Sequence, residues 1–282
     1  MTTILYSCAN LAYDQIFSPV VASPGIEPVL FSDRRPRFVR GWNWRPMPEA
    51  AASLGPALGN RSAKFFPMKI FPEADYSIYI DANLLVIADL TPLLAEFITS
   101  DADIGLFPHS ERRDIFSEFD FCKQVGKIAP GDYALGAEQL DFYRAEGLPE
   151  NHVLTENAII LRRHGRGEPR GAALEAAMEL WWDQLARFTK RDQLSLPYVL
   201  HRAGLDSGLN PGLKVKVWDW NYLAPNPYFS RYIHRRGALS DIQIFLSAKR
   251  HYSAAWRIPI DGAFSVYRGF VKPGIAKLRG GR

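Results

Sequence analysis

The stretch Tyr76–Asn83, which reads Y-S-I-Y-I-D-A-N, decides how this chain folds. Its first five residues are mostly β-branched or aromatic and show no helical period, which indicates a buried β-strand. Open α/β folds bind their ligands in the crevice where such strands end. The segment therefore predicts an α/β domain in which Asp81 is delivered to the ligand-binding edge of a sheet.

Asp81 and Asn83 place two side-chain oxygen donors two residues apart, directly after this strand. Mg²⁺ and Mn²⁺ prefer hard oxygen ligands, and Mg²⁺ is often held by one or two protein oxygens together with the phosphate oxygens of a substrate. The pair therefore indicates a cation site. An Asx turn at the end of the strand would use the same two residues, and the triplet alone does not decide between them.

Further apolar and amphipathic segments on both sides of this strand predict the rest of the domain. Strands are expected at Thr3–Ser7, Glu27–Ser32, Asp103–Phe107, Asn157–Arg162 and Val215–Trp218. Helices are expected at 110–125, 133–146, 172–188 and 193–203, and a loop at 33–48. The clearest helix carries one apolar stripe, formed by Leu174, Met178, Trp181, Leu185 and Phe188. Strands interspersed with helices, without internal repeats, predict an α/β sandwich whose mostly parallel central sheet is flanked by helices.

Length and charge set the expected domain organisation. With 282 residues and no convincing linker, we expect one domain over residues 1–208 and a C-terminal extension, 209–282, packed on it. The net charge of +4 comes from a basic tail, residues 262–282, which holds five basic and no acidic residues. Because the rest of the chain is nearly neutral, the charge does not indicate nucleic-acid binding. The tail could contact an anionic membrane surface, or it could be a solvated end.

The cysteines and the chain start bear on the expected compartment. Cys8 and Cys122 lie far apart and match no zinc or redox spacing, so we expect two reduced thiols. We expect neither a signal peptide nor a membrane span, because no basic n-region and no 18-residue apolar run is present. The expected location is the cytoplasm, with peripheral membrane contact if the basic tail binds lipid.

Several catalytic signatures are missing from the sequence: the P-loop, the G-x-G-x-x-G fingerprint, the G-x-S-x-G elbow and H-E-x-x-H. What remains is polar residues at the ends of predicted elements. Asp14 and Asp33 follow the first two strands and could bind a base or ribose hydroxyl, or could merely cap turns. Arg61 and Lys64 would share one face of a helix, where they could clamp a pyrophosphate or form a solvated basic surface.

The second half of the chain offers another set. Glu156 and Asn157 open a predicted strand and could hold acceptor hydroxyls. Asp192 precedes Gln193 at a predicted helix start, where it could cap the helix, and a cap residue can also be held rigidly in a pocket. The six histidines show no metal-ligand spacing. His109, after a strand, and His251, in the C-terminal region, are the two with a candidate role, although a lone histidine is more often structural.

Four segments, taken in order, carry a resemblance. They are I-L-Y-S-C-A-N-L-A-Y-D (Ile4–Asp14), V-L-F-S-D (Val29–Asp33), R-S-A-K-F-F-P-M-K-I-F-P-E-A-D-Y-S-I-Y-I-D-A-N (Arg61–Asn83) and W-W-D-Q-L-A-R-F-T-K-R-D-Q-L-S-L-P-Y-V-L (Trp181–Leu200). Together they resemble the bacterial and plant proteins long catalogued as a domain of unknown function and now grouped with GT-A-fold glycosyltransferases. The plant members are Golgi proteins linked to wall polysaccharide and mucilage. The resemblance covers roughly residues 3–205.

The resemblance implies a GT-A-like fold, that of nucleotide-diphospho-sugar transferases, and transfer of a sugar from such a donor to a glycan or glycolipid. Asp81 and Asn83 would be a divergent DxD motif that holds Mn²⁺ or Mg²⁺, with His251 as a third ligand. Arg61 and Lys64 would face the diphosphate.

Further roles follow from the same resemblance. The first strands would bind the nucleotide, through Tyr6, Asp14 and Asp33. Independently of the resemblance, Glu156 and Asn157 at a strand start, together with His109, are the candidates for holding acceptor hydroxyls. Asp192 and Gln193 are similar to a catalytic pair in glycogenin-like retaining transferases, where the aspartate lies beside the anomeric carbon.

Two alternatives stay open. A catalytically silent GT-A-like module that binds a nucleotide or glycan is compatible with Asn83, because a neutral amide is a weaker metal ligand than a carboxylate. A nucleotidylyltransferase-like enzyme would normally show a Gly-rich N-terminal loop, which we do not find.

Overall fold

The computed structural model describes residues 1–11, 14–36, 39–205, 213–220, 226–232, 244–246, 248–249, 251–253, 255 and 259. The basic tail 262–282, for which membrane contact is predicted, lies outside the described residues. Within the described part, none of the helices has the length and apolar character that crossing a bilayer requires.

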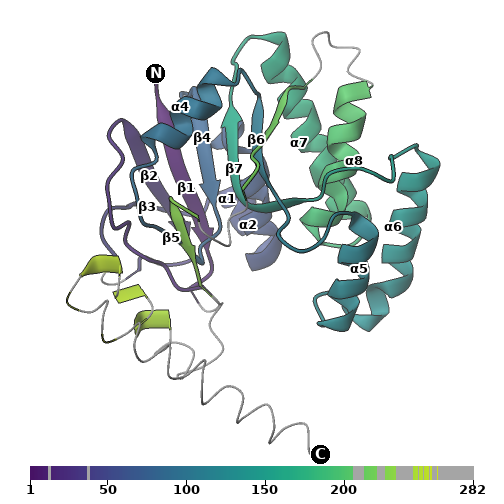
Figure 1. Ribbon diagram of the computed structural model, residues 1–282, viewed down its shortest axis with the longest axis horizontal. Coiled ribbons are helices and arrows are strands. Elements are labelled where there is room, and N and C mark those ends of the chain that lie inside the picture. Colours follow the sequence, from purple (N-terminus) through teal and green to yellow (C-terminus); the bar gives the residue numbers. More distant parts are fainter. Residues whose placement is uncertain are drawn as a thin grey trace, which may run out of the picture.

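A mixed sheet forms the centre of the molecule (Figure 1), with seven strands in the order β3-β2-β1-β4-β7-β6-β8. The strands are β1 Thr3–Ala9, β2 Ile26–Ser32, β3 Asn43–Pro46, β4 Tyr76–Ile80, β6 Ile104–Pro108, β7 Thr155–Arg163 and β8 Val215–Val217. Neighbours run parallel except at β7, which is antiparallel to both β4 and β6. The predicted mostly parallel α/β sheet is confirmed, with β7 as the exception.

The reversed direction of β7 determines which residues share an edge of the sheet. Ile80 at the end of β4 pairs with Ile159, and Pro108 at the end of β6 pairs with Thr155 at the start of β7. The first residues of β7 therefore lie beside the last residues of β4 and β6. This edge, where open α/β sheets bind ligands, collects side chains from strand ends and from one strand start.

Helices cover both faces of the sheet (Figure 1). They are α1 Glu49–Ala52, α2 Gly55–Phe65, α3 Pro67–Ile70, α4 Thr91–Thr99, α5 Ile115–Gln124, α6 Tyr133–Ala145, α7 Pro169–Arg187 and α8 Asp192–Leu205. On one face, strand residues such as Tyr6 and Ile160 pack with Phe65 of α2 and Trp181 of α7. On the other face, Ile78 packs with Phe97 of α4. The domain is therefore a three-layer sandwich.

The stripe of α7 is core packing, as predicted, because Leu174, Met178, Trp181 and Leu185 are all buried. The ring of Trp181 stacks on that of Phe65, with centroids 4.0 Å apart and 13° between the planes. Such an aromatic pair contributes about 0.5–1.5 kcal/mol beyond its buried area. The contact fixes the last turn of α2 against α7, and so sets where the next residues of both helices lie.

Some elements depart from the sequence prediction. The stretch predicted as a loop contains β3, a short edge strand whose residues are only partly buried, so it shows no apolar run. Helix α5 begins at Ile115 rather than near residue 110, because the carboxylate of Asp114 accepts a hydrogen bond from the Ser117 backbone N–H and caps the helix there. Helices α6 and α7 lie close to their predicted ranges.

The described residues of the C-terminal extension join the main body. Strand β8 pairs with β6 in the large sheet, where a strand was predicted at Val215–Trp218. A second, two-stranded sheet joins β9 (Phe229–Arg231) to β5 (Leu84–Val86), which directly follows Asn83. Ile244 and Ala248 belong to the same buried cluster as Leu85, so these residues lie near the same strand.

Candidate active site

The ammonium group of Lys64, in the last turn of α2, connects two predicted site residues. It lies 2.7 Å from Oδ2 of Asp192 and 3.8 Å from Oδ1 of Asp81. The side chains of Lys64 and Asp192 are 6% and 10% exposed, whereas that of Asp81 is 37% exposed. Three charged residues that are far apart in the sequence thus meet at the edge where β4 ends, with Asp81 on the solvent side.

Two tyrosines hold this cluster in place. The hydroxyl of Tyr79 donates a hydrogen bond to Oδ1 of Asp81 (2.8 Å), and the Lys64 ammonium lies 5.1 Å from the centre of the Tyr79 ring. The hydroxyl of Tyr6 donates to the backbone carbonyl of Lys64 (3.1 Å). Both rings are buried, so they fix the aspartate and the lysine from inside the core.

Asp192 is the first residue of α8, and its carboxylate accepts from Lys64. The indole N–H of Trp181 donates to its backbone carbonyl at 3.0 Å, which ties the start of α8 to α7. Burial alone would raise the pKa of Asp192, but the positive charges of Lys64, Arg61 and Arg191 hold it well below its usual range. Asp192 is therefore ionised at neutral pH. The structure brings Arg61 close enough to act on it, as the predicted helical face implied.

A second polar cluster joins this one through Gln193. The amide of Gln193 donates to Oε2 of Glu156 (3.0 Å), and Oε1 of Glu156 lies 3.2 Å from Nε2 of His109. His109 follows β6 and Glu156 opens β7, so the antiparallel pairing of these strands explains their contact. Two residues predicted to bind the acceptor are thus brought together, beside the predicted catalytic pair.

Two further residues of this cluster, Arg112 and Glu118, are not among the predicted site residues. Glu118 is fully buried, accepts a hydrogen bond from Nε of Arg112, and lies 3.6 Å from Arg191. Arg191 also donates to Oε1 of Gln193 (3.0 Å). The signal that could have revealed Arg112 is the charged run H-S-E-R-R-D directly after a predicted strand. Glu118 lies in the first turn of α5, where no sequence pattern distinguishes it from a surface residue.

Two predicted ligand contacts are corrected by the structure. Tyr6 is fully buried and its hydroxyl is bonded to the Lys64 backbone, so it supports the site rather than touching a nucleotide. Asn157 is also buried, and its side-chain oxygen accepts from the Thr155 hydroxyl (3.1 Å), which removes it from any acceptor surface. Every residue of β1 is buried, and so is Asn157 in β7, so neither side chain reaches an open surface.

Asp14 and Asp33 lie near the ends of β1 and β2, as expected. Asp33 accepts a hydrogen bond from the Leu11 backbone (2.8 Å), and Asp14 accepts one from the Asn10 backbone (3.0 Å). Both carboxylates therefore brace the segment after β1, which is the turn role that the sequence left open. Their contact with a nucleotide stays a prediction.

The predicted cation ligands differ in how they are held. Asp81 offers a half-exposed carboxylate that fits a hard cation sharing its coordination with phosphate oxygens. Asn83 is buried, and its amide nitrogen donates to the backbone carbonyl of Tyr232 (2.9 Å), which leaves the amide oxygen as its possible ligand atom. The described residues contain no group of three His, Cys, Asp or Glu side chains arranged around a metal position. His251 as a third ligand stays a prediction.

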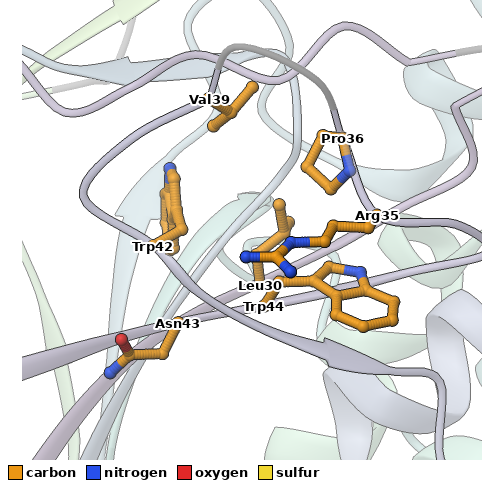
Figure 2. Close-up of a pocket in the computed structure, with 7 residues that line it drawn as sticks. All are labelled: Leu30, Arg35, Pro36, Val39, Trp42, Asn43 and Trp44. Atoms are coloured by element: carbon orange, nitrogen blue, oxygen red, sulfur yellow. The ribbon is translucent and has the colours of Figure 1, made fainter.

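A pocket of about 370 Å³ lies elsewhere, between β2, β3 and the segment that joins them (Figure 2). Figure 2 shows Arg35, Trp42 and Trp44 around it, with Leu30 behind them. The indole N–H groups of Trp42 and Trp44 are bonded to the Phe17 carbonyl and the Ser32 hydroxyl. None of the predicted site residues lines this pocket, so it is separate from the Lys64 cluster.

Fold and geometry define an α/β domain with a charged, partly open cluster where such sheets bind their ligands. The family comparison then gives its identity: the chain belongs to the TOD1/MUCI70 family of glycosyltransferase-like domains, whose model matches residues 57–215. That range holds Lys64, Asp81, Glu156 and Asp192. The family resemblance read from the sequence is confirmed.

The chain is also similar to individual proteins. The chain is 32% identical over 145 residues to the probable hexosyltransferase MUCI70 of Arabidopsis thaliana, which covers 48% of this chain and 23% of that protein. The chain thus corresponds to about a quarter of the plant protein. The crystal structure of mouse xyloside xylosyltransferase 1, in the apo form, aligns with 77% of this chain and 84% of its own, at 13% identity and a TM-score of 0.41.

Proposed function

We propose that this domain transfers a sugar from a nucleoside-diphosphate donor to a hydroxyl of a glycan or glycolipid. The observation that carries the proposal is the Lys64 ammonium held between Asp81 and Asp192 at the ligand-binding edge of the sheet. A fixed cation beside a half-exposed carboxylate suits a diphosphate, which binds both to a lysine and to a shared metal ion.

In this proposal Lys64 and Arg61 stabilise the negative charge that grows on the departing diphosphate. Asp81, with the amide oxygen of Asn83, would hold a divalent cation that supplies Lewis-acid stabilisation to the same phosphates when bound. The hydrogen bond from Tyr79 orients Asp81 in advance, so little reorganisation is needed when the donor binds.

Asp192 has a different part in the proposed reaction. It is ionised and nearly buried, and Lys64 fixes one of its oxygens. A carboxylate held in this way can stabilise positive charge on the sugar ring, or attack the anomeric carbon. Gln193, the next residue, would orient groups at the same carbon.

The proposal is tested first by donor binding. Sugar nucleotides of uridine and guanosine are screened by thermal shift, with and without MnCl₂. A ligand at a hundredfold excess over its Kd stabilises the native state by about 2.7 kcal/mol. For a domain of this size that is a rise in Tm of about 5–10 °C. Release of nucleoside diphosphate is then measured with the best donor; if no donor shifts Tm and none is cleaved, the proposed function is wrong.

One observation favours a second candidate, a silent module that binds a nucleotide or glycan without turnover. The amide nitrogen of Asn83 is bonded to the Tyr232 carbonyl, so this side chain serves the packing of the C-terminal segment as well. Donor binding without release of nucleoside diphosphate under any metal condition would support the silent module.

Location and membrane contact are separate proposals, resting on the sequence. We propose a cytoplasmic domain whose basic tail, 262–282, touches anionic lipid. Truncation after Asp261 should then lower binding to phosphatidylglycerol vesicles at low salt and leave donor binding unchanged. Full-length protein that ignores such vesicles would refute the membrane contact.

A further inference from the structure

We propose that Glu156 is the general base of the transfer, the group that takes the proton from the acceptor hydroxyl. This inference rests on the proposed function. It follows from the position of Glu156 at the start of β7, beside the ends of β4 and β6. It also follows from the hydrogen bonds that hold the Glu156 carboxylate there.

The position of Glu156 is set by β7. Because β7 runs antiparallel to its neighbours, its second residue pairs with Phe107 near the end of β6, close to the edge that carries Asp81. The Glu156 side chain is 12% exposed, so it is largely desolvated but still reachable. Its partner Gln193 adjoins Asp192, which connects it directly to the charged cluster around Lys64.

Both oxygens of the Glu156 carboxylate face a hydrogen-bond donor. Gln193 donates to Oε2. On the other side, Nδ1 of His109 accepts from the backbone N–H groups of Glu111 and Arg112, at 3.1 and 3.0 Å, so its ring proton must be on Nε2. Nε2 lies 3.2 Å from Oε1 of Glu156 and 2.9 Å from Nη2 of Arg112. Because a guanidinium offers no acceptor, the Nε2 proton is donated to Oε1. A base that must accept a proton along a defined direction needs this kind of fixed orientation.

His109 itself is a poor candidate for the base. Burial, followed by the charge of Arg112, lowers the pKa of His109 to about 4. Its Nδ1 is occupied by two backbone donors and its Nε2 carries the proton. His109 is therefore a positioning residue, which orients Glu156 as a neutral donor.

The pKa values of the two carboxyl groups of the site, Asp192 and Glu156, are shifted in opposite directions. Asp192 is held ionised by its cations and resists protonation, which makes it a weak base. Burial, opposed by Arg231 of β9 and reinforced by the negative charges of Glu118 and Asp81, raises the pKa of Glu156 to about 7; Lys127 acts weakly in the other direction. Paired carboxyl groups whose environments separate their pKa values in this way divide the chemical roles between them.

The acceptor oxygen forms a bond to the anomeric carbon while its proton passes to an oxygen of Glu156. The bond from the anomeric carbon to the diphosphate oxygen breaks, and the nucleoside diphosphate leaves with that electron pair, stabilised by Lys64 and Arg61. Glu156 then returns its proton to water. No further reactant is required.

The test uses Glu156→Gln in the full chain, with Glu175→Gln as the matched control, because Glu175 lies exposed on α7. Release of nucleoside diphosphate is measured with water as the acceptor, using the sugar nucleotide that gives the largest thermal shift. We expect Glu156→Gln to lower the rate by about 10²–10⁴-fold, with donor Kd within twofold of wild type and Tm not reduced. The control should keep the wild-type rate.

The dependence of kcat/KM on pH distinguishes a general base from a residue with a purely structural role. Since a base works when deprotonated, wild-type kcat/KM should rise through pH 7 and level off above it, and this limb should be absent from Glu156→Gln. His109→Leu, which removes one donor to the carboxylate, should move the limb to higher pH.

The two hypotheses fail in different ways. Wild-type turnover by a folded Glu156→Gln variant, or a flat wild-type profile between pH 6 and 8, would overturn the base while leaving the transferase intact. If Glu156→Gln does not fold, the pH profile of wild type and its displacement in His109→Leu decide whether Glu156 is the base. Absence of donor binding and cleavage in wild type would instead overturn the proposed function, and the base with it.

Discussion

Replacing Lys64 by methionine tests whether the cluster has been correctly described as a buried ion pair. The substitution keeps the length of the side chain and removes its charge. It leaves the Asp192 carboxylate, 10% exposed, without the ammonium that now lies 2.7 Å away. Removing one partner of a buried pair costs about 3–5 kcal/mol, because the other charge stays buried. Arg61 and Arg191 also act on Asp192, so we expect the lower value, about 3 kcal/mol.

The chain contains its own control for this substitution. Lys69 of α3 lies 3.0 Å from Glu179, almost the same separation, but both side chains are 57% exposed. An exposed pair contributes about 0–1 kcal/mol. Lys69→Met should therefore change little, although its chemistry is identical.

The assay is thermal unfolding of both variants at pH 7, with urea unfolding as a check. A loss of about 3 kcal/mol corresponds to a fall in Tm of about 6–12 °C, at about 2–4 °C for each kcal/mol in a domain of this size. Lys69→Met should stay within about 3 °C of wild type. Equal effects from the two substitutions would refute the reasoning, because burial would then have no influence on the energy of the pair.

Three further predictions concern the same site. Asp192→Asn keeps shape but removes charge, so nucleotide release should fall at least 100-fold with donor binding retained; wild-type turnover would reduce Asp192 to a structural residue. Asp81→Ala should abolish any Mn²⁺-dependent thermal shift while Asn83→Asp should preserve or increase it, and the opposite pattern would exclude the cation site. Because the pKa of Glu156 is raised from its ordinary 4.5 to about 7, its contribution to stability is complete below pH 4.5 and lost as pH rises through 7. Glu156→Gln should therefore gain stability over wild type between pH 5 and 8, by up to about 3 kcal/mol, and a constant difference across that range would contradict the raised pKa.

Much of the fold follows from local patterns in the sequence. The apolar runs predict β1, β2, β4, β6 and β8, and the stripe centred on Trp181 predicts α7, because burial of a continuous face leaves a clear period. Strand β3 has no such run, since an edge strand buries little. The direction of β7 is also invisible to this reasoning: a fully buried strand has the same composition whether it runs parallel or antiparallel to its neighbours.

The candidate site was predictable in its parts but not in its connections. Asp81, Lys64 and Asp192 each stood out as a polar residue at the end of an element. Their contact depends on the stacking of Phe65 on Trp181, which no local pattern encodes. For Tyr6 and Asn157 the sequence shows that each residue lies on or beside a strand, but not that its side chain is buried in the core. Glu118 could not be found, because its burial follows from tertiary packing alone.

The pairing of Lys64 with Asp192 closes a loop of 128 residues, and Glu156 reaches His109 only once β7 has paired with β6. Each half of the site is therefore built from residues that are distant in the sequence. Contacts of such long sequence separation form late in folding, once the entropy of loop closure has been overcome. A nascent chain would acquire the complete constellation only after α8 had emerged from the ribosome. The unfolding event that exposes the backbone amides of β7 to hydrogen exchange should also separate the two halves of the site. Loss of activity and loss of amide protection in the sheet should therefore occur at the same urea concentration.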